Sequence, residues 1–280
     1  MTTIKEEKRL ESLQDTARNL RIRILRMLHE SKSGHTGGSL SAADIITALY
    51  FQVMRHRPED PHWEGRDRFV LSKGHAAPAL YAALALSGYF EEGLLGTLRK
   101  VHSCLQGHPN ARCTPGVDAT SGSLGQGLSV ANGIALGLRL DGNEASVYAL
   151  LGDGEVQEGQ VWEAAMTAAH RRLGKVLAIV DNNGLQIDGF VKDVKGIEPL
   201  ADKWRSFGWD VRVVDGHDFG SLLPALESVK GKPLVDTPTM VIARTVKGKG
   251  VSIFENQAKY HGVAPSDDEL SRALQELGAA

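Results

Sequence analysis

The sequence has little of several features that would point to a particular environment. It contains only two cysteines in 280 residues, which excludes a disulfide framework and suits a reducing compartment. Its formal net charge of −2 gives no electrostatic reason to bind nucleic acid or an anionic membrane. No run approaches the roughly 20 apolar residues that a membrane span needs, and the charged start MTTIKEEKRLESL is not typical of a signal peptide. We therefore expect a cytoplasmic protein that binds neither nucleic acid nor membrane.

The pattern of apolar residues predicts an α/β fold. Apolar residues make up 42% of the chain and charged residues 24%, which suits a substantial core. Helical periodicity dominates the N-terminal part, and short Val/Ile/Leu runs alternate with helices after it. The predicted strands are Val147–Leu151, Val176–Val180, Asp210–Val214 and Met240–Ala243, and the predicted helices are 5–30, 39–54, 74–89, 124–140, 158–171, 200–207, 218–229 and a surface helix after Ser266 as N-cap. Such alternation indicates a doubly wound parallel sheet with helices on both faces and a helix-rich N-terminal third.

One carboxylate lies between two glycines where the first of these strands ends. The segment GDGEVQEG places Asp153 between Gly152 and Gly154, and the next apolar run ends in DNNGLQIDG, which offers Asn182 and Asn183. Ligands of open α/β sheets bind beyond the carboxyl ends of the strands. Glycine lets the backbone approach a ligand closely, and the helix that follows can direct its N-terminal amides at an anion. Carboxylate, amide and main-chain oxygens suit Mg²⁺ or Ca²⁺, so the residues predict a divalent ion that joins the protein to a diphosphate.

A second group of candidate ligands has a plainer interpretation. Cys104, Cys113, His102 and His108 lie together in VHSCLQGHPNARCTPG, which suggests a zinc site. The spacing lacks a Cys-x-x-Cys knuckle or a regular histidine pair. Two buried or half-buried thiols are therefore the better interpretation of these cysteines.

The motif pair GDGEVQEG and VDNNGLQIDG resembles the thiamine-diphosphate motif, and its details resemble transketolase. Gly-Asp-Gly alone is a common turn, but further segments match transketolase blocks in the same order. These segments are SGHTGGSLS (Ser33–Ser41), RDRFVLSKGHAAPALYAAL (Arg66–Leu84), GHPN (Gly107–Asn110), TSGSLGQGLSVANGIALG (Thr120–Gly137), IARTVKGKGV (Ile242–Val251) and YHGVAPSDDE (Tyr260–Glu269). Six ordered blocks are far more specific than one motif.

The resemblance implies thiamine diphosphate and Mg²⁺ as cofactors, with Ca²⁺ or Mn²⁺ able to replace Mg²⁺. It assigns the metal ligands to Asp153, Asn183 and the main-chain carbonyl of Leu185. It assigns the other cofactor contacts to Gly152, Gly154, Ile187, His75 and His261, and to Gly122, Ser123 and Leu124 in the loop that meets the aminopyrimidine. In many transketolases a proline stands where Ser123 does.

Two carboxylates, Glu158 and Glu163, match transketolase positions near the interface between protomers at the cofactor. A solvated first helical turn would favour acids there in any case. The resemblance favours the interface and includes Glu158 among the cofactor contacts.

Four histidines, His35, His75, His108 and His261, lie in separate matching blocks. A lone histidine is more often structural than catalytic, but the resemblance places these four in one cleft as catalytic residues. It implies that His75 and His261 lie near the diphosphate and the reacting centre, and that His35, His108 and His261 face substrate hydroxyls. Near-neutral imidazoles can donate to hydroxyls and shuttle protons. The remaining histidines match nothing and are interpreted as surface or structural: His29, His56, His62, His102, His170 and His217.

Transketolases continue through a second α/β domain and a C-terminal domain, which this sequence does not contain. In the family, a glutamate of the second domain activates the aminopyrimidine, and basic groups there hold the sugar phosphate. We therefore expect residues 1–280 to form a single diphosphate-binding domain that works with a separate C-terminal transketolase subunit of roughly 300 residues. Two such domains would associate with each other in a heterotetramer. The implied reaction is two-carbon ketol transfer from a ketose phosphate to an aldose phosphate, as in the pentose phosphate pathway.

Three alternatives stay open at this point. The α subunit of a 2-oxoacid dehydrogenase carries a similar motif, but it lacks this set of histidine blocks. A cofactor-free interaction protein could keep the fold, although the intact metal ligands argue against it. A split transketolase for a branched or sulfonated sugar remains compatible with the sequence, because the contacts to the far end of the sugar would lie in the partner.

Overall fold

The computed structural model describes residues 4–279, and a five-stranded parallel sheet forms its centre. The strand order is β1-β2-β3-β7-β6. The strands are β1 (Arg68–Leu71), β2 (Val147–Gly152), β3 (Val176–Asn182), β6 (Asp210–Asp215) and β7 (Thr239–Arg244), and a short antiparallel pair, β4 (Leu185–Gln186) and β5 (Gly189–Phe190), follows β3. The four predicted strands are confirmed, each to within one or two residues at its ends.

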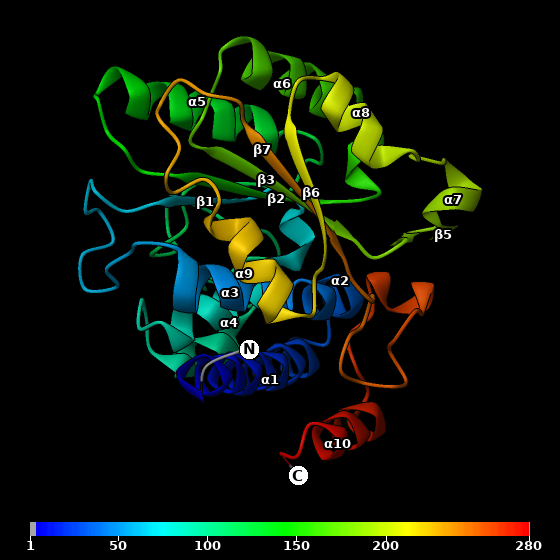
Figure 1. The fold of residues 1–280 in the computed structure, drawn as a ribbon. Helices are drawn as coiled ribbons and strands as arrows, with labels where there is room; N and C mark the ends of the chain where they lie inside the picture. Colours follow the sequence, from blue (N-terminus) through cyan, green and yellow to red (C-terminus); the bar gives the residue numbers. More distant parts are fainter. Residues whose placement is uncertain (1–3, 280) are drawn as a thin grey trace.

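Helices cover both faces of this sheet. The helices are α1 (Ile4–Ser31), α2 (Thr36–Ser41), α3 (Ala43–Ala48), α4 (Ala77–Leu86), α5 (Gly127–Leu140), α6 (Gly159–His170), α7 (Val191–Val194), α8 (Leu200–Ser206), α9 (Phe219–Glu227) and α10 (Asp267–Glu276). Figure 1 shows α5, α6 and α8 on one face, and α1, α3, α4 and α9 on the other. The predicted α/β class with a doubly wound sheet is therefore confirmed.

Alternating side chains of each central strand enter two separate cores. In β2, Tyr148 and Leu150 pack into the core that includes α1, α3, α4 and α9, whereas Val147, Ala149 and Leu151 pack into the core that includes α5 and α6. Successive side chains of a strand point to opposite faces, and both faces are covered here. The whole strand is consequently buried, which explains why its sequence reads as a continuous apolar run.

Two local predictions need correction and one is confirmed. The strand β1 was missed, because charged residues at Arg66–Arg68 precede a very short apolar run. The predicted single helix 39–54 is divided into α2, α3 and a π-helical turn at Leu49–Val53, with Ala42 at the first break. The expected N-cap Ser266 is confirmed: its hydroxyl accepts from the N–H of Glu269 (3.3 Å), whose carboxylate accepts from the N–H of Ser266 (2.9 Å).

The parallel register brings the carboxyl ends of three strands to one edge of the sheet. Gly152 of β2 pairs with Asp181 of β3, which pairs with Ala243 of β7. The loops that follow these strands therefore begin side by side. None of the helices formed by residues 4–279 is both long and apolar enough to cross a bilayer.

Candidate functional site

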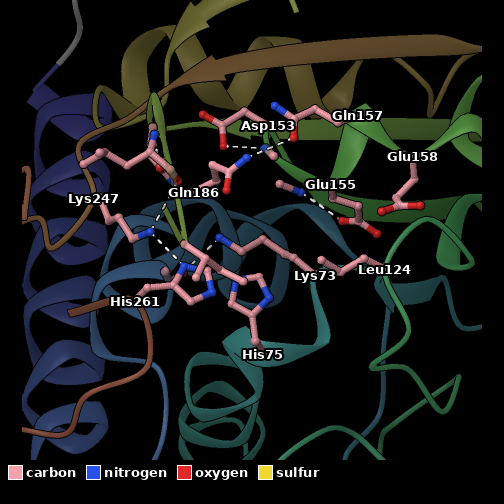
Figure 2. Close-up of a pocket in the computed structure, with 16 residues that line it drawn as sticks. Lys73, His75, Leu124, Asp153, Glu155, Gln157, Glu158, Gln186, Lys247 and His261 are labelled. Atoms are coloured by element: carbon pink, nitrogen blue, oxygen red, sulfur yellow. Dashed lines mark hydrogen bonds between the residues drawn. The ribbon is translucent and has the colours of Figure 1, made fainter. Parts of the chain in front are cut away.

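A cavity of about 230 Å³ opens at the carboxyl edge of the sheet. Figure 2 shows the side chains of Lys73 and Lys247 between Asp153 on one side and His75 and His261 on the other. The lining residues are Gly38, Lys73, His75, Leu124, Gly152, Asp153, Gly154, Glu155, Gln157, Glu158, Asn183, Leu185, Gln186, Ile187, Lys247 and His261. The cavity thus combines carboxylates, amides, ammonium groups and imidazoles from loops that are far apart in the sequence.

Asp153 is a buried carboxylate at the end of β2, with an exposed fraction of 2%. Its Oδ1 accepts from the N–H of Gly154 (2.8 Å) and its Oδ2 from the N–H of Gly184 (2.5 Å). Burial, together with repulsion from Asp181, raises the pKa of Asp153 to about 6, and the two backbone donors offset only part of this. A cation bound at Asp153 would favour its ionised form.

The three residues of the predicted metal site, Asp153, Asn183 and Leu185, line the cavity beyond the ends of β2 and β3. Asn183 Oδ1 accepts from the N–H of Leu185 (3.1 Å), and the carbonyl oxygen of Leu185 accepts from Lys247 Nζ (3.3 Å). Together with the Asp153 carboxylate they form a hard-oxygen donor set, which fits Mg²⁺. In the part of the chain that the structure describes, no group of three or more His, Cys, Asp or Glu is placed to hold a metal ion. A divalent ion here would therefore rely on these mixed oxygens and on ligand oxygens.

Two buried lysines, Lys73 and Lys247, are functional candidates that sequence reasoning missed, and each is only 1% exposed. Lys247 Nζ contacts His261 Nδ1 at 2.9 Å as well as the Leu185 carbonyl. Burial and the nearby charge of Lys73 lower the pKa of Lys247 to about 8. Lys73 lies in the segment SKGH and Lys247 in TVKGKG, both within blocks that match transketolases. From sequence alone, only the histidine of the first segment was named as a candidate. Two ammonium groups at one cavity favour an anionic ligand.

Asp181 holds Lys73 in place. Its carboxylate is fully buried and accepts from Lys73, from Thr245 and from the hydroxyl of Ser41 (2.6 Å). Burial alone would raise the pKa of Asp181, but Lys73 and the hydroxyl donors more than offset it, so the pKa is lowered. Lys73 Nζ also donates to the carbonyl of Gly38 (3.1 Å), which ties α2 to the sheet edge.

Glu155 joins the glycine loop to the end of β2. It is 2% exposed and accepts from Ser72, from the N–H of Gly125 (2.9 Å) and from the N–H of Gly152 (3.0 Å). Sequence reasoning also missed this carboxylate. It connects the SGSLGQG loop to the strand end, and Leu124 of that loop lines the cavity. Its signal was present in GDGEVQEG, where it is the first acid after the Gly-Asp-Gly turn.

The four predicted histidines form one cluster. The ring centroids of His75 and His261 lie 5.1 Å apart, and His35 lies 5.2 Å from His75, 5.4 Å from His261 and 6.3 Å from His108. Burial lowers all four pKa values, assisted by neighbouring cations, to about 4 for His35 and about 3 for His261. The imidazoles are therefore neutral at pH 7, when each carries one donor and one acceptor nitrogen.

Most other predicted site residues also line the cavity, namely Leu124, Gly152, Gly154, Glu158, Asn183, Leu185 and Ile187. Ile187 is 63% exposed at its edge. The remaining ones lie elsewhere. Gly122 packs on His108, where a Cβ would come within 3.2 Å of the ring, while Ser123 in the same loop and Glu163 on α6 are exposed.

The two cysteines differ in exposure. Cys104 is half-buried as expected, but Cys113 is exposed, so the expectation of two buried or half-buried thiols is wrong for Cys113. The loop around Cys113 lies at the surface, where its neighbours Ala111 and Arg112 are also exposed.

Comparison with known families decides the assignment. Residues 12–280 match the family described as "Transketolase, thiamine diphosphate binding domain". The chain belongs to the transketolase family. The match covers the sheet, the cavity and all four clustered histidines, and it favours a transketolase over the α subunit of a 2-oxoacid dehydrogenase.

Similar proteins include both single subunits and full-length transketolases. The chain is 45% identical over 268 residues to the "6-deoxy-6-sulfo-D-fructose transketolase subunit SqwG" of Clostridium sp. (strain MSTE9), covering 95% of this chain and 96% of that protein. It is 42% identical to an apulose-4-phosphate transketolase subunit of Actinobacillus succinogenes, covering 95% and 96%. The structure of transketolase from Campylobacter jejuni is similar with a TM-score of 0.88 and 34% identity, over 95% of this chain but only 42% of that one.

Proposed function

We propose that this chain is the diphosphate-binding subunit of a thiamine-diphosphate-dependent transketolase that works with a separate C-terminal subunit. One observation carries the proposal: a single cavity joins a hard-oxygen donor set at the ends of β2 and β3 to two buried ammonium groups and a cluster of neutral histidines. The first two features suit a metal-bound diphosphate, and the third suits sugar hydroxyls. The family match supports thiamine diphosphate as the cofactor.

The residues present fit the cofactor's anionic end. Asp153, Asn183 and the Leu185 carbonyl would hold Mg²⁺, and the backbone of Gly154 would meet the diphosphate. Lys247 donates to the Leu185 carbonyl, so metal binding at this oxygen would require its ammonium to turn toward the phosphate oxygens. When bound, the thiazolium supplies the electron sink for two-carbon ketol transfer.

The histidine cluster would orient the sugar and move protons. His75 and His261 line the cavity, and His35 and His108 extend the cluster away from it. His35 Nδ1 is buried and makes no hydrogen bond within residues 4–279, so a ligand hydroxyl would satisfy it. Neutral imidazoles can accept a proton at one nitrogen and donate at the other, as general acid-base steps on sugar hydroxyls require.

Two observations support the division of the enzyme into separate chains that associate. The relatives from Clostridium and Actinobacillus, which match over 96% of their own length, are named as subunits, whereas this chain spans about two fifths of the Campylobacter transketolase. On α5, a Cβ added at Gly133 or Gly137 would meet no described atom within 4 Å apart from the backbone of its own helix. Val130 of α5 and Met166 of the neighbouring α6 are 39% and 53% exposed. We propose that residues 1–280 form one diphosphate-binding domain, that this surface mediates self-association in a cytoplasmic heterotetramer, and that Glu158 and Glu163 lie near that interface.

The names of the relatives favour a second candidate for the sugar. Two relatives, 45% and 42% identical to this chain, are named for 6-deoxy-6-sulfo-D-fructose and apulose 4-phosphate. A sulfonated or branched sugar is therefore an alternative to the ketose phosphates of the pentose phosphate pathway. The contacts that would discriminate between them lie at the far end of the sugar, which we assign to the partner.

Reconstitution tests both candidates. The chain would be co-expressed with a C-terminal transketolase subunit from the same genome, and ketol transfer would be measured with xylulose 5-phosphate, 6-deoxy-6-sulfo-D-fructose or a branched-sugar phosphate as donor. Transfer that requires both chains, Mg²⁺ and thiamine diphosphate is expected, and the preferred donor identifies the sugar class. No thermal stabilisation of the complex by thiamine diphosphate and Mg²⁺ would instead favour a cofactor-free interaction protein.

A further inference from the structure

A cluster of two buried side chains, Arg21 and Asp44, and the half-buried His217 lies outside the cavity and has no part in the proposed function. Arg21 and Asp44 are 6% and 5% exposed, and the His217 side chain is 13% exposed. The guanidinium of Arg21 donates twice to Asp44, at 2.9 and 2.6 Å, and His217 Nδ1 lies 2.6 Å from Asp44 Oδ2. The three residues come from α1, α3 and the loop before α9, so the cluster joins separate parts of the fold.

The hydrogen bonds of His217 define its tautomer. The N–H of Val246 donates to His217 Nε2 (2.8 Å), so this nitrogen must be the acceptor. Nδ1 therefore carries the proton and donates to Asp44. Burial would raise the pKa of Asp44, but Arg21 and His217 offset this and lower it, so the acceptor stays ionised. His217, which sequence reasoning interpreted as surface or structural, is held in one orientation.

This cluster makes hydrogen bonds to both ends of the turn formed by residues 246–249. His217 binds Val246, which lies beyond the end of β7, where the strand ladder no longer supplies an acceptor for its N–H. Arg21 Nε donates to the carbonyl of Lys249 (3.0 Å) at the other end. Lys247 lies between these two contacts.

The side chain of Lys247 extends from this turn to the cavity. A Cβ at Gly37 would lie 2.9 Å from Lys247 Cγ, which shows that the lysine stem passes directly over α2. The ammonium then reaches the Leu185 carbonyl. A lysine is a point charge on a flexible stem, and Lys247 lies close enough to Lys73 for repulsion between the two charges. Its backbone must therefore be fixed if the ammonium is to stay at the cavity.

We propose that His217 is a positioning residue for Lys247: by accepting the Val246 N–H it fixes the turn that directs the Lys247 ammonium at the anionic end of the bound cofactor. Asp44 acts through it, because it accepts from Nδ1 and so leaves Nε2 as the acceptor. Arg21 holds Asp44 and also fixes the Lys249 end of the turn directly. The nature of the anion, a diphosphate, rests on the proposed function. The placement of Lys247 by His217 does not.

Paired substitutions separate the two hydrogen bonds of His217. The amide oxygen of His217→Gln can accept from Val246, whereas the shorter side chain of His217→Asn can replace only the donor to Asp44. His217→Ala removes both. Calorimetry of the complex with its partner chain should show thiamine diphosphate affinity in Mg²⁺ falling about tenfold in the Ala and Asn variants, the lower end of the effect of losing one hydrogen bond to a charged group. The Gln variant should recover most of that affinity, and turnover at saturating cofactor should stay near wild type in all three.

A stability control and crystal structures complete the test. Val229→Ala creates a cavity at a fully buried position after α9, so it should lower the denaturation midpoint without changing cofactor affinity. In crystal structures without cofactor, the Lys247 ammonium should no longer reach the Leu185 carbonyl in the Asn variant, and it should still reach that oxygen in the Gln variant. If wild type binds no thiamine diphosphate, the proposed function fails while these structures still test the placement. Lys247 in its wild-type position in both variants, or equal cofactor affinity in both, would overturn the inference even if His217→Ala does not fold.

Discussion

Lys73 and Asp181 form an ion pair at the cavity in which both side chains are almost inaccessible to solvent, with exposed fractions of 1% and 0%. Two further donors, Ser41 and Thr245, complete the shell of the carboxylate. A buried ion pair of this kind adds little to the net stability of the fold, because desolvation offsets much of the attraction between the charges. Its main effect is to fix the position of the Lys73 ammonium group.

Removing only one member of this pair should be strongly destabilising. Asp181→Leu leaves the Lys73 ammonium buried without its counter-charge, and we expect a loss of about 3–5 kcal/mol in the free energy of unfolding. The double variant Lys73→Met, Asp181→Leu should lose less than the single variant. Urea denaturation checks both, with the exposed pair Arg205–Asp202 as control, where Asp202→Asn should change stability by less than about 1 kcal/mol. A double variant at least as unstable as Asp181→Leu would contradict the argument.

Substitution of Asp153 should remove metal-dependent cofactor binding. Asp153→Asn keeps the size of the side chain but removes the only charged oxygen of the predicted metal site, so calorimetry should detect no Mg²⁺-dependent binding of thiamine diphosphate to the complex. Asp188→Asn, at an exposed position in the turn between β4 and β5, serves as the matched control and should bind normally. Unchanged affinity in Asp153→Asn would remove Asp153 from the site.

Protons should compete with the metal at Asp153. Its pKa is raised to about 6, so below this pH the unliganded carboxyl group is mostly protonated. A metal requires the ionised form. The apparent affinity for Mg²⁺ and thiamine diphosphate should therefore decrease by up to about tenfold per pH unit as the pH falls below about 6, and calorimetry between pH 5 and 8 measures this. A flat profile across that window would show that Asp153 does not carry the metal.

The histidine cluster should make the unliganded protein sensitive to mild acid. The pKa values of His35 and His261 are lowered to about 4 and about 3, below the value of about 6.5 in an unfolded chain. Below pH 6.5 the unfolded state therefore binds more protons at these histidines than the folded state does. The contribution of the neutral histidines to the free energy of unfolding is complete above that pH and is lost as the pH falls toward 4 and 3. Thermal denaturation between pH 7 and 5 should show a shallower decline for His261→Asn than for wild type. The control His170→Asn, at an exposed position, should show the same decrease in melting temperature with pH as wild type. An equally steep decrease for His261→Asn would contradict the prediction.

The glycine face of α5 should control self-association. Gly137→Leu places a large side chain where the described chain has no atom within 4 Å, so the fold should survive while a close helix contact between two copies would be blocked. Analytical ultracentrifugation should show wild-type dimers and at least a tenfold weaker dimer for this variant. Gly93→Leu also projects into open space, on another part of the surface, and should associate like wild type. Equal dimerisation of Gly137→Leu and wild type would exclude α5 as the interface.

Much of the architecture follows from short-range patterns in the sequence. The strands β2 and β3 are readable because both faces of the sheet are covered, which makes their sequences continuously apolar. Strand β1 could not be recognised from its sequence, because the charged residues Arg66 and Asp67 come directly before it. The fold accommodates these charges in ion pairs: Asp67 pairs with Arg55, and Arg66 pairs with Asp118. Such pairings join residues distant in the sequence, and no local pattern reveals them.

The candidate site divides in the same way. Asp153 and Asn183 can be placed together from sequence, because each follows a strand of one parallel sheet. The histidine cluster needed the family resemblance, since four loops bring it together. The burial of Lys73, Lys247 and Glu155 could not be predicted, because charged side chains are normally exposed and only the tertiary fold shows which ones are enclosed with partners.

The exposure of Ile187 at the cavity edge has a consequence for how this enzyme could diversify. Asp153, Lys73 and Lys247 are fixed at the cavity by buried contacts, whereas the rim beside Ile187 is exposed, where the proposed partner would complete it. The site for the diphosphate and the contacts to the far end of the sugar would then be encoded in separate genes. An organism could redirect such an enzyme to a new sugar by exchanging the second gene, while the chain shown in Figures 1 and 2 stays as it is.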